Sequence, residues 1–141
     1  MLKVEWADDG PVPVPKAKAD ALAALCAKVL KAEVPKSAQK GSVNLVFCTD
    51  PHIRALNKRF RKLDKVTDVL SFNYDEDDVF GEIYIATAKT KRQAPRWKNS
   101  FSAELRRLVV HGALHLAGFD HMNARDRKVM RAREDRYLPP E

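Results

Sequence analysis

The sequence predicts an α+β domain in which helices pack on a mixed sheet of roughly four strands. Strand-forming residues such as Val, Ile, Leu, Phe and Tyr are concentrated in four segments, at residues 2–6, 42–49, 67–74 and 79–86. Between and after these segments, apolar residues recur at the spacing of a helix. The last two strands are joined only by the acidic link 75–78, which is short enough for a hairpin and therefore for an antiparallel pair.

The first strand and the first helix are predicted from alternation and periodicity. Residues 2–6 alternate in strand fashion, and the proline-rich stretch 11–15 reads as an extended connector. A helix at 16–33 follows, because Pro35 lies beyond its end and apolar side chains recur at helical spacing. These side chains are Leu22, Leu25, Cys26, Val29 and Leu30.

A second helix is expected directly after the strand at 42–49. Thr49 can cap this helix, Pro51 lies in its first turn, and the helix runs to about Arg61. Its surface also carries Arg54, Lys58, Arg59 and Lys62. A solvated basic face is the simplest interpretation of such a run, and a surface that holds nucleic acid is the alternative.

The most strongly helical part of the chain is predicted at 102–117. A weaker helix at 87–94 precedes it and is broken at Pro95, Ser102 can cap the longer helix, and Gly118 can end it. Apolar residues fall on two sides of the helical wheel, with Leu105, Leu108, Val109 and Leu116 nearly opposite Val110, Leu114 and Ala117. A helix that is apolar on two sides is a central, buried one.

The last helix is expected from about residue 123 to residue 137. It is dense in arginine and acidic residues, and Val129 and Met130 are its few apolar contacts. We therefore expect it to lie on the surface.

Length and composition fit one domain over residues 1–141. With 45% hydrophobic and 32% charged residues, the chain can bury a core and is not a disordered tail. No apolar run approaches the roughly 18 residues of a membrane span, and the first ten residues carry Glu5, Asp8 and Asp9 where a signal peptide would be basic and then apolar. We expect a cytoplasmic protein with no membrane partner.

Charge, cysteines and glycines narrow the function classes. A net charge of +7 favours a polyanion such as nucleic acid as the partner. Cys26 and Cys48 lie far apart in apolar segments, so we expect buried thiols rather than a disulfide. None of the five glycines builds a GxGxxG or GxxxxGK loop, so no nucleotide cofactor is expected.

Three of the four histidines fall within eleven residues, at His111, His115 and His121. His111 and His115 are one helical turn apart, so both imidazoles can reach one metal ion. Gly118 can take a left-handed conformation that turns the chain and brings His121 back towards the same ion. Three protein ligands with an open position are typical of catalytic zinc, one per chain. A site closed by Asp120 is the alternative.

The spacing matches the HExxHxxGxxH pattern of metzincin peptidases with one departure, because Gly112 stands where the general-base glutamate would be. A protein that lacks this glutamate is expected to be a poor peptidase. Phosphodiester hydrolysis is less demanding, since a phosphate oxygen of the substrate can accept the proton. Gly112 also allows another backbone or a substrate to approach the helix closely.

The segment from His111 to His121 resembles the HGxLHLxGYDH motif of the bacterial YbeY endoribonuclease family, with Phe119 where tyrosine is usual. Further segments resemble that family's LNxxYR, pTDVLSF and GDI motifs, at residues 56–61, 67–72 and 81–83. Two other departures are Val66 for the usual proline and Glu82 for aspartate. None of the three departures touches a histidine, and the role of Glu82 stays open.

The resemblance implies an endoribonuclease specific for single-stranded RNA, acting in ribosomal RNA maturation, including the 16S 3′ end, and in ribosome quality control. It implies a zinc ion on His111, His115 and His121 and a metal-activated water that attacks the phosphodiester. The family's arginine implicated in RNA handling maps onto Arg61. The implied partners are ribosomal RNA, the small ribosomal subunit and its assembly factors.

Several other residues receive a structural interpretation. Thr67 and Asp68 are expected to be turn or hydrogen-bonding residues, while Ser71 can face the cleft. We expect His52 to be an exposed structural residue rather than a fourth ligand. Arg106 and Arg107 lie on the histidine-bearing helix, with Arg107 nearer to the histidine side, and either can be a surface charge. Core packing is the default for the two tryptophans, Trp6 and Trp97, and stacking on bases is the alternative.

The sequence leaves two alternative functions open. One is a ribosome-assembly factor that binds RNA and protein, in which zinc mainly holds the fold. The other is a small metallopeptidase, which Gly112 and the basic charge both disfavour.

Overall fold

The computed structural model describes residues 2–74, 78–119 and 124–138. Its sheet contains β1 (Lys3–Asp8), β2 (Ser42–Cys48), β3 (Val69–Asn73) and β4 (Val79–Ala86) in the order β1-β2-β4-β3. The pairs β1·β2 and β2·β4 are parallel, whereas β3 and β4 are antiparallel, with Ser71 opposite Ile83. The prediction of a mixed four-stranded sheet with a hairpin is therefore confirmed.

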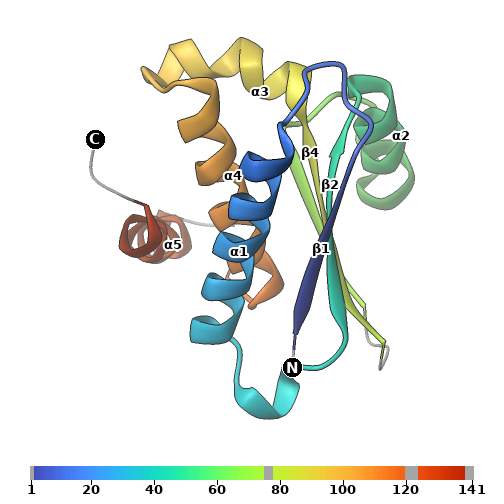
Figure 1. Cartoon of the computed structure of the whole chain (residues 1–141). Coiled ribbons are helices and arrows are strands. Elements are labelled where there is room, and N and C mark those ends of the chain that lie inside the picture. The colour runs from blue at the N-terminus through green and yellow to red at the C-terminus, as the bar shows by residue number, and fades with distance from the viewer. Residues whose placement is uncertain (1, 75–77, 120–123, 139–141) are drawn as a thin grey trace.

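Helices cover both faces of this sheet (Figure 1). In chain order they are α1 (Lys16–Glu33), α2 (Asp50–Arg61), α3 (Thr87–Gln93), α4 (Phe101–Leu116) and α5 (Ala124–Tyr137), with short 3-10 turns at Lys36–Ala38 and Ala94–Trp97. Helices α1 and α4 pack on one face and α2 packs on the other, while α5 lies outside α1 and α4 (Figure 1). None of the described helices is both long and apolar enough to cross a membrane.

The main core lies between the sheet and the α1 and α4 helices. The fully buried strand residues of this core are Val43, Leu45, Phe47, Ile83 and Ile85. Helix α4 buries side chains all round, including the predicted Leu105, Leu108, Val109, Val110 and Leu114. The predicted central, buried helix is thus confirmed. A smaller cluster under α2 contains Cys48, Ile53, Leu70 and Ala86.

The ends of α4 are fixed by two local motifs. The prediction of Ser102 as the N-cap is wrong, because Ser100 has the extended backbone and its Oγ accepts a 3.0 Å bond from the N–H of Ala103. At the other end Gly118 has φ of 104° and donates its N–H to the carbonyl of His115, while the N–H of Phe119 donates to that of Leu114. This pair of bonds is a Schellman motif, so the predicted stop at Gly118 is confirmed.

Helix α5 is anchored more deeply than the sequence suggests. Met130 is buried in the main core, whereas Val129 is 47% exposed. Tyr137, at the end of the helix, also packs against this core, whereas the predicted contact of Val129 is wrong because Val129 faces away from the core.

Helix α4 approaches the sheet most closely at Gly112. A Cβ atom at this position would lie 2.8 Å from Cγ2 of Ile83, which is too short for a real contact, and 3.1 Å from Oγ of Ser71, which is unusually tight. The same serine hydroxyl donates a 3.1 Å bond to the carbonyl of Gly112. A close approach at Gly112 is thus present, but the side chains of Ile83 and Ser71 make it, where the sequence led us to expect another backbone or a substrate.

We expect Gly112→Glu, which restores the metzincin glutamate, to lower the free energy of unfolding by about 3 kcal/mol or more. The side chain would enter the contact with Ile83 and Ser71 and bury a charge there. Urea denaturation measures the change. Arg106→Glu on the same helix is the control, with a loss below about 1 kcal/mol. A Gly112→Glu protein with wild-type stability would contradict this packing.

Candidate metal centre and its surroundings

Helix α4 brings His111 and His115 together on one side. Their ring centroids lie 4.8 Å apart and the ring planes cross at 68°. Gly112, the residue between them that faces the strands, leaves the two imidazoles on a different side of the helix. Because His111 and His115 are one helical turn apart, their ring nitrogens lie close enough together to reach one metal ion.

Helix α5 supplies a carboxylate to this pair. Nδ1 of His111 lies 2.6 Å from Oε1 of Glu134, and both side chains are mostly buried, with 21% and 14% exposed. Sequence reasoning missed Glu134 because it lies 23 residues away along the chain in an arginine-rich helix. No local pattern distinguishes it from its acidic neighbour Asp135.

The third predicted ligand, His121, and the alternative ligand, Asp120, lie outside the described residues. Within the ranges that the structure describes, no group of three His, Cys, Asp or Glu side chains is placed to hold a metal ion. The described part of the site thus contributes two imidazoles, and a three-histidine site requires His121.

The residues present suit a zinc ion chemically. Neutral imidazole is a preferred zinc ligand, and a zinc-binding histidine almost always has a carboxylate or carbonyl on its other ring nitrogen. His111 has such a partner in Glu134 at 2.6 Å. Because Nδ1 contacts Glu134, Nε2 is the ring nitrogen through which His111 would bind a metal ion.

Arg61 ends α2 and contacts β3. Its Nη2 donates a 2.9 Å bond to the carbonyl of Ser71, and its guanidinium lies 5.1 Å from the centre of the Phe72 ring. The hydroxyl of Ser71 in turn binds the carbonyl of Gly112 on α4. A single residue of β3 therefore connects the arginine of α2 to the histidine-bearing helix.

The rest of the basic face on α2 is partly neutralised. Arg54 pairs with Asp64 at 2.8 Å and Lys58 lies 4.0 Å from the same carboxylate. Arg54 lowers the pKa of Asp64 through their hydrogen bond. The simple interpretation of a solvated face therefore fits Arg54 and Lys58, while Arg61 is held in a defined place.

A buried polar network joins α3, α4 and the start of β3. Glu104 is fully buried and accepts two bonds from Arg107, 2.7 Å from Nε and 3.0 Å from Nη2. Gln93 and Asn99 donate to the same carboxylate, and Gln93 also donates to Asp68. The sequence signal for this network was an acidic residue three positions before an arginine on a buried helix.

Arg107 and Arg106 point in different directions. Arg107 lines a pocket together with His111, whereas Arg106 donates to Ser102 and lines an apolar pocket against α1. The prediction that Arg107 is nearer to the histidine side is confirmed.

Other predicted residues have structural roles. Asp68 accepts bonds from the N–H of Val69 and from Gln93, as its position at a strand entry suggests. The carboxylate of Glu82 accepts bonds from the hydroxyls of Tyr74 and Tyr84. His52 is half-buried rather than exposed, because its ring packs edge-on against Tyr84 at 5.7 Å.

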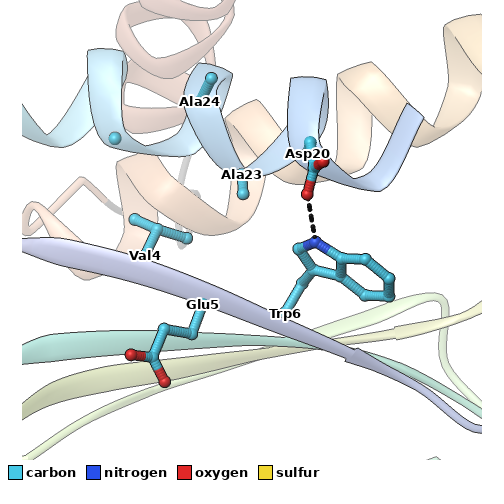
Figure 2. A pocket seen from close by; sticks show the side chains of 7 residues that line it. Val4, Glu5, Trp6, Asp20, Ala23 and Ala24 are labelled. Atoms are coloured by element: carbon cyan, nitrogen blue, oxygen red, sulfur yellow. Dashed lines mark hydrogen bonds between the residues drawn. The ribbon is translucent and has the colours of Figure 1, made fainter. Parts of the chain in front are cut away.

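The tryptophans and cysteines lie apart from the histidines. Trp6 is partly buried and donates a 2.8 Å bond from Nε1 to Asp20, in a shallow pocket between β1 and α1 (Figure 2). Core packing is wrong for Trp97, which is 66% exposed because it lies on a surface turn. Cys26 and Cys48 are buried free thiols as predicted, and burial raises the pKa of both to about 12.

Comparisons with known proteins agree with one another. The family model described as "Endoribonuclease YbeY" matches residues 12–140. An Endoribonuclease YbeY of Pelotomaculum thermopropionicum is 36% identical over 138 residues, which cover 92% of this chain and 90% of the relative. One of Desulforamulus reducens is 42% identical over 106 residues, covering 68% and 69%. The solution structure of a Thermotoga maritima protein matches with a TM-score of 0.63 and 31% identity, covering 97% of this chain and 86% of that one.

The Glu104 network makes stability depend on acid pH. Burial acts to raise the pKa of Glu104, but the bonds from Arg107, Gln93 and Asn99 outweigh burial, and the pKa lies below the ordinary 4.5. A lowered folded-state pKa contributes stability that is present above the unfolded pKa and is lost as pH falls. We expect Glu104→Gln to lose less unfolding free energy than the wild type between neutral pH and about pH 3.5, measured by urea denaturation.

The exposed Glu5 of β1 provides the control, since Glu5→Gln should retain the wild-type loss of stability in acid. An equal loss in the wild type and in Glu104→Gln would show that the network does not couple stability to pH.

Proposed function

The chain belongs to the endoribonuclease YbeY family and is a hydrolase that acts on RNA, and we propose that it is a zinc enzyme that cuts single-stranded ribosomal RNA. The observation that carries the zinc part of this proposal is the pair of imidazoles on α4 with Glu134 on Nδ1 of His111. His111, His115 and His121 would hold one zinc ion per chain, with His111 binding through Nε2.

When bound, a zinc ion would lower the pKa of water and offset negative charge on a phosphate group. Two positions of the chain bear on which group could accept a proton from that water. Gly112 packs against β3 and β4, so no side chain takes the place of the metzincin glutamate there. Glu134 is occupied by His111. We therefore assign the proton to a phosphate oxygen of the substrate.

Arg61 would hold the RNA backbone in this proposal. A guanidinium carries five N–H donors, so its bond to the Ser71 carbonyl leaves capacity for a phosphate. That bond and the Phe72 ring fix the side chain in advance, which reduces the entropy lost when RNA binds. The net charge of +7 adds affinity for a polyanion.

The natural substrate and the partners that we propose go beyond the family assignment. We propose ribosomal RNA, including the 16S 3′ end, as the substrate, with action in the cytoplasm on the small ribosomal subunit and alongside its assembly factors. Contacts to phosphate carry little sequence information, so the choice of cleavage site would come from these partners.

A structural role for zinc is the second candidate, and one contact favours it. The Glu134 bond to His111 ties α5 to α4, so a metal on His111 would also strengthen the attachment of α5. In that case the protein would act mainly as an assembly factor that binds RNA and protein. Metal removal separates the two candidate functions, because the main core should stay folded after the loss of a catalytic ion.

We expect His115→Ala to abolish zinc binding and RNA cleavage together, because the site loses one of its three ligands. Elemental analysis and cleavage of a single-stranded RNA measure the two properties. Arg61→Glu is the comparison: it should weaken cleavage while about one zinc per chain is retained. Cleavage by metal-free His115→Ala would overturn the proposed mechanism.

Glu134→Gln should weaken zinc affinity by about 10- to 100-fold, because the carboxylate orients the His111 ring and makes its other nitrogen more basic. Competition with a fluorescent zinc chelator measures the affinity. Asp135→Asn, on the exposed side of α5, removes the same charge from the neighbouring position and should retain wild-type affinity. Equal affinities for all three proteins would exclude a role for Glu134 in metal binding.

A further inference from the structure

A pocket between α4 and α5 adjoins the histidine pair and is rich in arginine. It is lined by Arg107, His111, Arg127, Met130, Arg131 and Glu134, a set that we call the arginine pocket. Its one carboxylate is the one that contacts His111. Three arginines thus line a pocket that also contains a proposed metal ligand, and clustered arginines are the charge pattern that recognises phosphate.

Arg107 is the most firmly placed of the three arginines. Glu104 has 0% of its side chain exposed and holds the guanidinium through Nε and Nη2, at 2.7 and 3.0 Å. The bonds from Gln93 and Asn99 fix the carboxylate itself. Arg107 keeps 30% of its side chain exposed. Part of this side chain therefore remains accessible from the pocket, although Glu104 holds it.

The free energy needed to bury the Glu104 carboxylate argues that its pair with Arg107 does more than hold helix α4 in place. Burying a carboxylate is unfavourable unless its bonds are excellent, and apolar residues of similar size often hold a helix as well or better. The Glu104 pair holds Nε and one N–H of Nη2, and a guanidinium has five N–H donors in all. The pair therefore fixes one edge of the guanidinium and leaves N–H groups for a ligand.

We propose that the arginine pocket binds a phosphate group of single-stranded RNA beside the metal centre, with Arg107 as the contact residue and Glu104 as its positioning residue. This inference rests on the proposed function. Arg107 lies one helical turn before His111, so a phosphate on Arg107 is adjacent to whatever His111 binds. The pocket would thereby set which stretch of the RNA backbone faces the metal.

The test uses the double variant E104Q/R107Q, loaded with zinc. The variant keeps the net charge of the wild type and replaces both ionised groups by amides, so neither buried charge is left alone. Arg106→Gln is the matched control: it removes an arginine from the neighbouring position of α4, where the side chain bonds to Ser102 and lines a different pocket.

Binding is measured by fluorescence anisotropy with a phosphorothioate-linked oligouridylate, which resists cleavage, over a range of salt concentrations. We expect E104Q/R107Q to bind roughly tenfold more weakly at low salt. Its plot of log affinity against log salt should be shallower by about 0.7, the slope that one phosphate contact gives on a single strand. Zinc content should stay at the wild-type value, and Arg106→Gln should keep the wild-type slope.

A second variant, Arg107→Lys, tests the same inference if the double variant folds poorly. Arg107→Lys keeps the charge beside Glu104 but lacks the planar fork, so it should bind the oligouridylate several-fold more weakly with zinc retained. Wild-type affinity and slope in both variants, or an equal change of slope in Arg106→Gln, would overturn the inference.

Cleavage of an unmodified oligouridylate by the same proteins separates this inference from the proposed function. If the wild type binds RNA through Arg107 but does not cut it, the inference stands and the proposed activity fails. If the wild type cuts RNA and the variants bind it with wild-type affinity and slope, only the inference fails. If the wild type neither binds nor cuts, both fail.

Discussion

The contact between α4 and the β3–β4 hairpin is the constraint on which the rest of the structure depends. Because Gly112 has no side chain, the helix lies against Ile83 and Ser71 at a distance that any larger residue would increase. This contact fixes the rotation of the helix, and the rotation places His111 and His115 on a side of α4 other than the one that packs on the sheet at Gly112. The residue that distinguishes this motif from that of the metzincin peptidases is therefore a packing residue first.

Both ends of α4 and its neighbours then fix the site more finely. The Glu104 network holds the first turns of the helix to α3, and the Gly118 motif ends the helix directly after His115 and Leu116. Glu134 brings α5 onto His111 from the outer side. A rigid helix with a carboxylate on one imidazole would suit the proposed metal-dependent RNA hydrolase, because the orientation of the ligand would not have to be gained on metal binding.

The sequence predicted what local pattern and spacing determine. The order of strands and helices, the buried character of α4, the stop at Gly118 and the shared side of His111 and His115 all follow from periods of two and 3.6 residues. Glu134 and the bonds to Glu104 were missed because they join segments that no short pattern relates. The N-cap was misplaced by two residues, from Ser100 to Ser102, because both serines precede the apolar pattern and only backbone geometry separates them. His121 carries the strongest sequence signal that the described structure does not reach.

The bond from Arg61 to the Ser71 carbonyl also matters for how the sheet ends. Strand β3 is the last of the four, and the bonds of Asp68 and Tyr74 to β4 leave the Ser71 carbonyl directed outwards. An outward row of backbone groups is a template on which a strand of another molecule can add and start aggregation. Arg61 occupies one of these acceptors and places a positive charge along the rim. The side chain to which we assign RNA binding thus also protects the β3 edge of the sheet.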